Sequence, residues 1–260
     1  PYTTTPPTYL EQARQTILGG AKESMLFCYR ALSEEQPGME DTEALRAERP
    51  GLLKLAYLTE TKKIVGVSVP KKPDVDAEEE RYLSSFYGML GIPVCPEVDL
   101  DAGAPSAILG AQALGFAGIR DYALDMREKG VPLAFSEAFL RKTGFCAGPD
   151  DPVIAPGADN WSLMDMDAEA LNALRDRLTA PLGLRFRAPT RVALNLYDQD
   201  MEVVQNFLDE PVQVELDLFG RDPKARKVAL VLSEGREVGL VREGSRYALT
   251  IPPRTLVVLN

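Results

Sequence analysis

Residues 62–136 alternate between short apolar runs and helical apolar faces. The run at residues 63–69 is β-branched and is followed by Pro70, which is typical of a buried parallel strand. From Ala77 to Leu90 the apolar positions recur at helical spacing behind an acidic first turn, and Gly91 ends this predicted helix. The apolar positions of that helix are Leu83, Phe86, Tyr87 and Leu90.

Three more apolar runs follow, at residues 93–95, 107–109 and 131–135. A helical face over residues 119–126, closed by Lys129 and Gly130, separates the last two. Strands that alternate with helices of this length imply parallel pairing and right-handed crossovers. We therefore predict an α/β layer over residues 61–184, with a flavodoxin-like or class I amidotransferase-like parallel sheet.

The period of the pattern changes after Pro189. Asp167 is expected to cap a helix that ends near residues 181–183, and alternating apolar and polar residues then take over. Turn residues separate the alternating runs, which predicts an antiparallel β-sandwich over residues 185–260. The predicted strands are residues 191–197, 202–207, 212–218, 228–232, 237–241, 247–251 and 255–259.

Residues 1–60 contain a helix, a strand and a second helix. Thr8 is a candidate N-cap of a helix to Ile17, residues 24–29 form an apolar strand, and residues 33–38 are polar and predict a loop. The second helix runs from Asp41 to Leu58 and is expected to break or restart at Pro50. The strand needs neighbours that this segment lacks. It either joins the edge of the central sheet or is the tail of a larger (β/α) barrel.

Composition excludes several classes of protein. A net charge of −10 over 260 residues argues against nucleic-acid binding, which depends on clustered Lys and Arg. No apolar run is long enough to cross a membrane. The three cysteines are odd in number and far apart, which favours a reducing, cytoplasmic location. The opening residues lack a secretory leader, and we expect the chain to be a fragment or a processed product.

The chain contains no histidine. This excludes Ser-His-Asp and Cys-His-Glu catalysis and any site that needs imidazole as a base or metal ligand. We predict no metal, no cofactor and no catalytic residue in this chain.

The weaker motifs are best explained as structure. Cys146 lies in a G-x-C-x-G sequence, the form of an amidotransferase nucleophile elbow, but a helix is predicted before it and Pro149 and Pro152 follow. Gly110 to Gly118 follows a strand, yet it lacks the spacing of a dinucleotide-binding loop. Trp161 is expected to pack between domains rather than to stack on a sugar.

Paired carboxylates are the residues that glycoside hydrolysis requires. Each candidate pair here lies in turn-rich sequence, where Asp caps helices and forms turns. We therefore expect capping and turn roles for Asp74 with Asp76, Asp165 with Asp167, and Asp198 with Asp200.

The order of the three segments resembles the C-terminal part of a multidomain glycoside hydrolase of the β-galactosidase (family 42-like) type. The resemblance is carried by residues 12–30, which look like the last barrel helix-to-strand step, by residues 37–42, and by residues 247–259, which resemble the last strands of a glycosidase sandwich. It implies a barrel-derived segment at 1–60, an amidotransferase-like trimerisation domain at 61–184 and a β-sandwich at 185–260.

By this resemblance Tyr29 and Arg30 lie where the family's last barrel strand lines the sugar subsite. The resemblance also places the family's acid and nucleophile on earlier barrel strands, outside this chain. We thus expect a non-catalytic region that serves oligomerisation, a trimer by resemblance, and frames the active site for a carbohydrate bound by the missing barrel. The alternatives are a Cys146-dependent amidotransferase-like hydrolase and a carbohydrate- or ligand-binding module.

Overall fold

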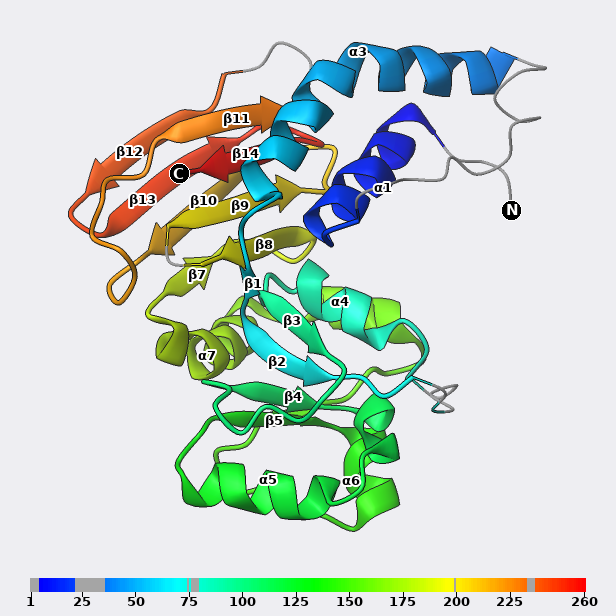
Figure 1. The fold of residues 1–260 in the computed structure, drawn as a ribbon, viewed down its shortest axis with the longest axis vertical. Helices are drawn as coiled ribbons and strands as arrows, with labels where there is room; N and C mark the ends of the chain where they lie inside the picture. The colour runs from blue at the N-terminus through cyan, green and yellow to red at the C-terminus, as the bar shows by residue number, and fades with distance from the viewer. Residues whose placement is uncertain (1–4, 22–35, 74, 76–79, 199, 233–236) are drawn as a thin grey trace.

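The computed structural model describes the chain apart from residues 1–4, 22–35, 74, 76–79, 199 and 233–236. Figure 1 shows a parallel sheet with its helices in the lower half and two antiparallel sheets in the upper half. Among the described residues, no helix combines the length and the apolar character needed to cross a membrane.

One extended segment takes part in both halves of the molecule. Strand β1 (Ile64–Val65) pairs antiparallel with β8 (Val192–Tyr197), and β2 (Val67–Pro70) pairs parallel with β3 (Val94–Glu97). Gly66 separates them, and a Cβ there would lie 2.2 Å from the carbonyl oxygen of Pro93. The single strand predicted at residues 63–69 is therefore two strands, because the crossing backbones leave no room for a side chain.

The parallel sheet has the strand order β3-β2-β4-β5-β6. Numbered along the chain, its strands are therefore ordered 2-1-3-4-5, and each neighbouring pair is parallel. The remaining strands are β4 (Ala107–Leu109), β5 (Leu133–Ser136) and β6 (Val153–Ile154). The predicted strands at 107–109 and 131–135 are confirmed, whereas β6 lies in a stretch that sequence patterns do not distinguish from a loop.

Helices cover both faces of this sheet. Helices α4 (Leu83–Met89) and α7 (Ala168–Thr179) pack with Val67 and Ile108, and α5 (Ile119–Glu128) and α6 (Glu137–Thr143) pack with Leu109 and Phe135. Asp167 caps α7, as predicted, by accepting hydrogen bonds from the backbone N–H groups of Glu169 and Ala170. Short 3₁₀ helices connect these elements: η2 (Ala111–Gly115), η3 (Asn160–Asp165) and η4 (Ala180–Leu182).

The two antiparallel sheets form the predicted sandwich. One has the order β1-β8-β9-β14-β11 and the other the order β12-β13-β10-β7. Side chains from both sheets meet in one apolar core that includes Leu194, Val204, Val214 and Leu249. All seven predicted strands are present, and β7 is an addition. The bounds are β7 (Arg185–Arg187), β9 (Met201–Asn206), β10 (Val212–Asp217), β11 (Val228–Leu232), β12 (Gly239–Glu243), β13 (Arg246–Ile251) and β14 (Leu256–Leu259).

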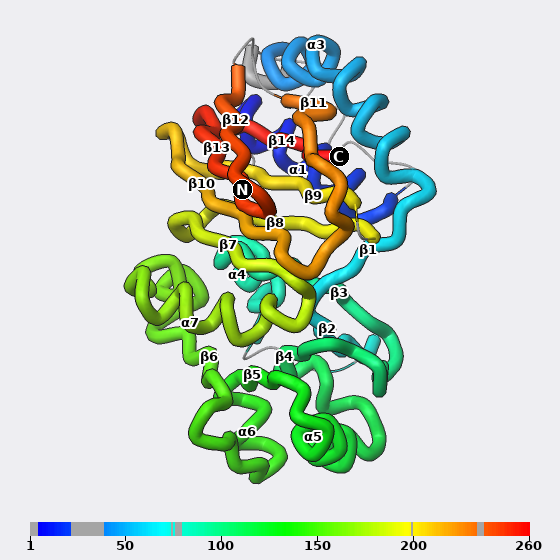
Figure 2. Tube along the Cα trace, turned by 90° about the vertical axis from the view of Figure 1, so that its left-hand side faces the viewer, coloured from blue at the N-terminus to red at the C-terminus, as the bar shows by residue number. Residues whose placement is uncertain are grey.

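The two N-terminal helices cover the outer face of the five-stranded antiparallel sheet (Figures 1 and 2). Helix α1 (Pro6–Leu18) and helix α3 (Gln36–Thr59) bury Leu18 and Leu55 against Val203 and Val258 of that sheet. The hydroxyl of Tyr197 in β8 donates to the carbonyl oxygen of Leu18 at 2.6 Å, which ties α1 to the sheet.

Three predictions about these helices are wrong. Helix α1 is preceded by Thr5 as its N-cap, so Thr8 lies inside the helix. Helix α3 begins at Gln36, within the predicted polar loop, and continues through Pro50 instead of stopping there. Figure 1 shows α3 changing direction along its length, as a proline-containing helix can without ending. The predicted strand at residues 24–29 lies outside the described residues.

Candidate functional site

The first candidate site is the carboxyl edge of the parallel sheet, between β2 and β4. Doubly wound sheets bind ligands at this point, because the chain leaves the two central strands toward opposite faces and opens a crevice. In this chain the crevice is filled by the carboxylate of Glu80, whose side chain is 5% exposed. Its Oε2 accepts a hydrogen bond from the backbone N–H of Ala111 at 2.6 Å. The cavity that remains measures about 10 Å³.

Two hydroxyl groups surround this carboxylate. A Cβ added to Gly110 would lie 3.0 Å from Glu80 Oε2, 3.7 Å from the Tyr87 hydroxyl and 3.8 Å from Ser136 Oγ, so the three groups converge on one glycine. Burial, and secondarily the negative charge of Glu80, raises the pKa of Tyr87 well above its ordinary value. The phenol therefore stays protonated and is not a base.

Ser136 stands at a turn from a strand into a helix, the position that a nucleophile elbow requires. It is fully buried, its backbone has an ordinary extended φ of −83°, and its Oγ accepts from the N–H of Phe139 to cap α6. A helix cap without backbone strain is a structural role. Cys146 instead lies exposed after α6, where the preceding Gly144 ends the helix. The G-x-C-x-G sequence thus has no strand leading into it.

The second candidate site is a groove of about 470 Å³ between the parallel sheet and the sandwich. It lies beside residues 98–106, which connect β3 to β4 without a helix, so a loop rather than a helix borders this face of β2 and β3. The polar groups of the groove come from Lys63, Ser68, Cys95, Glu97 and Asp101. Its far wall is formed by residues 180–183 and by Gly220 and Arg221 of the sandwich.

Burial changes the acidity of two groups in this groove, Glu97 and Cys95. Burial raises the pKa of Glu97, with Asp101 adding to the effect, while a hydrogen bond from Ser68 Oγ and the charge of Lys63 oppose it. Burial, followed by the charge of Glu97, raises the pKa of Cys95, so its thiol is a poor nucleophile. Burial raises the pKa of the nearby Tyr122 to about 12. The groove can exchange hydrogen bonds with a polar ligand, but it contains no activated nucleophile.

The sequence-predicted sugar-lining residues, Tyr29 and Arg30, lie outside the described residues. So do Asp74 and Asp76. Of the other carboxylates, Asp167 caps α7, and Asp198 lies in the turn between β8 and β9 with a positive φ of 44°. Asp200 pairs with Lys62 at 2.5 Å. Asp167, Asp198 and Asp200 thus lie at a helix cap or in a turn, as the sequence predicts, whereas Asp165 is the last residue of η3.

Trp161 packs between elements. Its ring meets Phe86 of α4 edge-on, with centroids 5.1 Å apart, and the guanidinium of Arg191 lies 5.7 Å from the ring centroid. Arg191 directly precedes β8 of the sandwich, so Trp161 joins the two halves of the molecule, and more than half of it remains exposed. Within the described part of the chain, no three His, Cys, Asp or Glu side chains are grouped to hold a metal ion.

Sequence reasoning missed Glu80, Ser68 and Glu97. Glu80 is the last of three consecutive glutamates in the first turn of the helix predicted from Ala77, but α4 begins only at Leu83, and nothing in the pattern indicates that Glu80 is buried. A signal for Ser68 was available, because it is the one hydroxyl within an otherwise apolar strand. Glu97 follows Pro96 at the end of β3 and shares a sheet face with Ser68, which becomes apparent once the register Ser68–Cys95 is known.

Comparison with known proteins shows a similarity of fold to solved structures. No family model and no curated protein matches the chain. An α-L-fucosidase (isoenzyme 2) from Paenibacillus thiaminolyticus is similar in structure, with a TM-score of 0.58 and 11% identity over 98% of this chain and 57% of that one. A family 42 β-galactosidase from G. stearothermophilus gives a TM-score of 0.51 and 12% identity over 99% of this chain and 51% of that one.

An exo-carrageenase of family 42 from Bacteroides ovatus gives a TM-score of 0.46 and 10% identity, over 100% of this chain and 39% of that chain. This chain therefore spans between 39% and 57% of the length of these three structures. At such low identity, the similarity to the first two structures concerns the fold. Its fold, a mixed α/β structure with one parallel and two antiparallel sheets, is similar to part of the fucosidase chain and part of the β-galactosidase chain.

Proposed function

We propose that this chain is a non-catalytic part of a cytoplasmic glycoside hydrolase of the family 42-like type. In this proposal residues 1–60 belong to the end of a barrel, residues 61–184 form an amidotransferase-like layer and residues 185–260 form the sandwich. The fold shared with parts of two glycoside hydrolases supports it. The strand order 2-1-3-4-5 of the parallel sheet supports a flavodoxin-like arrangement.

The observation that carries the non-catalytic role is the position of Glu80. In an active doubly wound enzyme the crevice between the two central strands must admit a substrate. Here a carboxylate from the same chain occupies the crevice and accepts from a backbone N–H, as a bound anion would. Among the described residues that line it, the remaining space measures only about 10 Å³, much less than a sugar ring occupies. The layer retains the geometry of a binding fold with its binding position closed.

The proposed roles are oligomerisation, as a trimer by resemblance, and framing of the active site of a barrel that binds the carbohydrate. Two exposed apolar side chains on the parallel layer agree with the first role. Leu124 on α5 and Val153 on the edge strand β6 are 46% and 45% exposed, and edge strands can pair with another chain. For the second role, the framing of the active site, we assign Tyr29 and Arg30 to the sugar subsite.

The isolated 260-residue chain, assayed with nitrophenyl glycosides of galactose and fucose, tests the central claim. We expect no turnover above that of a mock preparation. Turnover that copurifies with the chain and disappears in the Glu97→Gln variant, while persisting in the exposed control Glu215→Gln, would overturn it. In a whole protein that carries this chain, Arg30→Ala should raise KM more than it lowers kcat, because a subsite residue binds substrate without reacting.

The groove beside Ser68 supports a second candidate function, a carbohydrate- or ligand-binding module. Its volume of about 470 Å³ is sufficient for a small polar molecule, and Glu97 and Ser68 provide hydrogen-bonding groups that reach it. Titration calorimetry of the isolated chain with mono- and disaccharides tests this function. Binding that Glu97→Gln weakens and Glu215→Gln leaves unchanged would favour it over the framing role alone.

A further inference from the structure

The two sheets of the sandwich end in the edge strands β1, β11, β7 and β12. An edge strand offers unpaired backbone N–H and C=O groups, and proteins usually shorten, bend or cover it. Strands β1 and β7 are two and three residues long, and Arg187 of β7 forms an ion pair with Asp176 of the neighbouring helix α7. In β11 the register shifts between Val228 and Leu230, and α3 packs against Leu232. These three edges are thus shortened, bent or covered.

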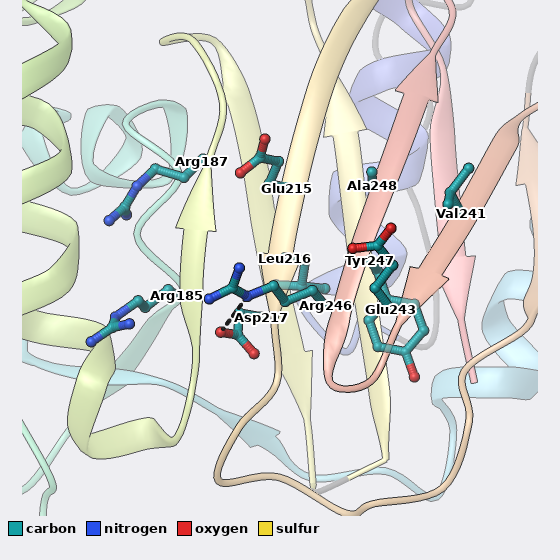
Figure 3. A pocket seen from close by; sticks show the side chains of 10 residues that line it. All are labelled: Arg185, Arg187, Glu215, Leu216, Asp217, Val241, Glu243, Arg246, Tyr247 and Ala248. Atoms are coloured by element: carbon teal, nitrogen blue, oxygen red, sulfur yellow. Dashed lines mark ion pairs between the residues drawn. The ribbon is translucent and has the colours of Figure 1, made fainter.

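Strand β12 differs from the other three. It is five residues long, pairs with β13 without a register shift, and contains neither proline nor lysine. Among the described residues it is hydrogen-bonded to β13 alone, and Figure 1 shows it at the margin of the sandwich. Its middle residue, Val241, is 62% exposed and projects beside Ala248 on the outer face of the sheet (Figure 3). An open edge with an apolar side chain at its centre favours pairing with another strand.

The strand pairings determine which backbone groups of β12 are free. In an antiparallel sheet, alternate residues of a strand direct their N–H and C=O groups to opposite neighbours. The N–H of Leu218 donates to the carbonyl oxygen of Ser245, in register with β10 and β13, so the even-numbered residues of β13 face β12. Opposed to these are the odd-numbered residues of β12, including Val241. Leu240 and Arg242 therefore direct their backbone groups outward.

These outward groups are arranged symmetrically about Val241. When a second β12 lies antiparallel beside the first, with Val241 opposite Val241, Leu240 of each copy lies opposite Arg242 of the other. Each such pair exchanges two N–H···O hydrogen bonds. The two valines form a pair without hydrogen bonds, whose Cα atoms lie about 4.5 Å apart, so their side chains touch. The two-fold axis passes between them, perpendicular to the sheet, and one sheet continues across both copies.

No like charges oppose one another in this register. Glu243 lies opposite Gly239 of the other copy, which has no side chain. The guanidinium of Arg242 lies over the ring of Tyr247 and donates to the carbonyl oxygen of Gly244 at 2.9 Å. It is therefore held toward the turn of the hairpin, away from the axis, and the charge of the second copy does not oppose it.

We propose that two copies of this chain associate edge to edge through β12, with their Val241 side chains in contact at a two-fold axis. The contact is small, because a strand of five residues extends over about 17 Å. Stable interfaces cover about 800 Å² on each partner, so this association belongs to the weak class, with a dissociation constant on the order of 100 μM. Backbone hydrogen bonds and apolar contacts are not screened, so about 1 M salt should not weaken it.

This inference goes beyond the proposed function. Strand β12 lies on the sandwich, whereas the glycoside hydrolase proposal assigns oligomerisation to the parallel layer. Self-association is also measured without any substrate. Failure of the inference therefore leaves the proposed function standing, and the reverse also holds.

A charge swap at residue 241 tests the two-fold axis. The axis places this residue opposite itself, so Val241→Lys and Val241→Glu each set like charges against each other in their own dimers. By sedimentation equilibrium of the full chain, each variant alone should associate at least five-fold more weakly than the unaltered chain. In an equimolar mixture the two variants supply opposite charges, and the dimer should recover. Because Val241 is exposed, both variants should keep the unfolding midpoint of the unaltered chain.

Arg242→Pro and its control Arg242→Ala test the backbone pairing. Both substitutions remove the side chain, but only proline removes an outward N–H, which an edge strand can lose without losing its own ladder. Arg242→Pro should abolish association at about 1 mM, whereas Arg242→Ala should change the dissociation constant less than about three-fold.

Hydrogen exchange of the unaltered chain gives the same answer if the proline variant fails to fold. The amide protons of Leu240 and Arg242 should exchange several-fold more slowly at about 1 mM than at about 10 μM. That of Val241, already directed to β13, should not change. The inference is overturned if the unaltered chain is monomeric at about 1 mM, if the mixed charge variants associate no better than each alone, or if Arg242→Pro associates as Arg242→Ala does.

Discussion

The parallel layer buries its charged side chains singly against backbone groups, whereas the sandwich buries three of them together. Arg175 of α7 is fully buried and donates to the carbonyl oxygens of Leu90, Ala188 and Pro189 at 2.7, 2.6 and 3.2 Å. Glu80 in turn accepts from a backbone N–H. In the sandwich, Glu202 accepts from Arg221 at 2.8 Å and from Arg226 at 2.7 Å, and all three side chains are buried.

The two regions differ in which parts of the structure their buried charges hold in place. A charge satisfied by backbone groups holds the path of the chain, because those groups belong to segments far apart in sequence. Arg175 joins the end of α4 to the strand region that opens the sandwich, and burial lowers its pKa to about 10 while leaving it cationic at neutral pH. In the sandwich the charges satisfy one another, and the two arginines also donate to the carbonyl oxygens of Asp198 and Lys224, so the triad holds these turns together as one unit. The parallel layer should therefore depend on single residues, and the sandwich on the completeness of its triad.

The largest effect is expected from Glu202→Gln. This change leaves two buried guanidinium groups without their counter-charge, which costs about 3–5 kcal/mol of unfolding free energy. Urea unfolding measures it. Glu215→Gln is the matched control in the same sandwich, and on an exposed face it should cost about 0.5 kcal/mol or less. Equal effects of the two substitutions would show that the triad is not a unit.

Arg175→Met should be the next most damaging change, at about 3 kcal/mol, because one buried and two partly buried carbonyl groups lose their donor. Arg177→Met on the same helix is the control. Its side chain is 39% exposed and lies 3.8 Å from Asp151, so about 1 kcal/mol or less is expected. If both variants unfold at the same urea concentration, the hydrogen bonds from Arg175 to backbone carbonyl groups do not hold the two halves together.

Replacement of Glu80 separates its charge from its shape. Glu80→Ala removes a charge-assisted hydrogen bond to the N–H of Ala111 and should cost about 2 kcal/mol. Glu80→Gln keeps an oxygen acceptor in place and should cost less than half as much. The comparison is made by thermal and urea unfolding. If the two variants have the same unfolding free energy, the carboxylate of Glu80 does not occupy the place of a bound anion.

The smallest effect is a change in pH dependence from Glu97→Gln. Because burial raises the pKa of Glu97, the folded protein binds this proton more tightly than the unfolded chain does. That stabilisation is present below the ordinary carboxyl pKa of about 4.3 and is lost as pH rises through the raised value. The variant should therefore lose less stability than the unaltered chain as pH rises above about 4.3. Urea midpoints measured from pH 4 to 7 test this, and parallel curves would refute it.

The sequence predicts most elements of this fold because their patterns are local. The seven sandwich strands follow from alternation, and α7 follows from Asp167 and the apolar spacing behind it. The misjudged elements lack such patterns or break their rules. Strand β6 has two residues, too few for a period, and Pro50 is tolerated within α3 because packing of Leu52 and Leu55 on the sandwich stabilises the helix on one side of it.

The candidate sites were less predictable. The absence of histidine and the turn positions of Asp167 and Asp198 were sufficient to set aside most catalytic arrangements. The closed crevice was not visible, since Glu80 lies among three adjacent glutamates and 31 residues from the N–H group that it meets. The groove likewise lies beside a connection without a helix, between β3 and β4. Such a connection can be recognised as the border of a groove only when the neighbouring sheet face is known.

By itself the sequence determined the kind and order of the elements, the change from a parallel layer to a sandwich, and the exclusion of imidazole chemistry. These depend on the period of apolar residues and on which side chains are present. Tertiary structure alone decided that residues 64–70 divide between two sheets, that α1 and α3 cover the sandwich, and that Glu80 closes the crevice. Each of these outcomes is a contact between segments distant in the chain, and local periodicity carries no information about such a partner.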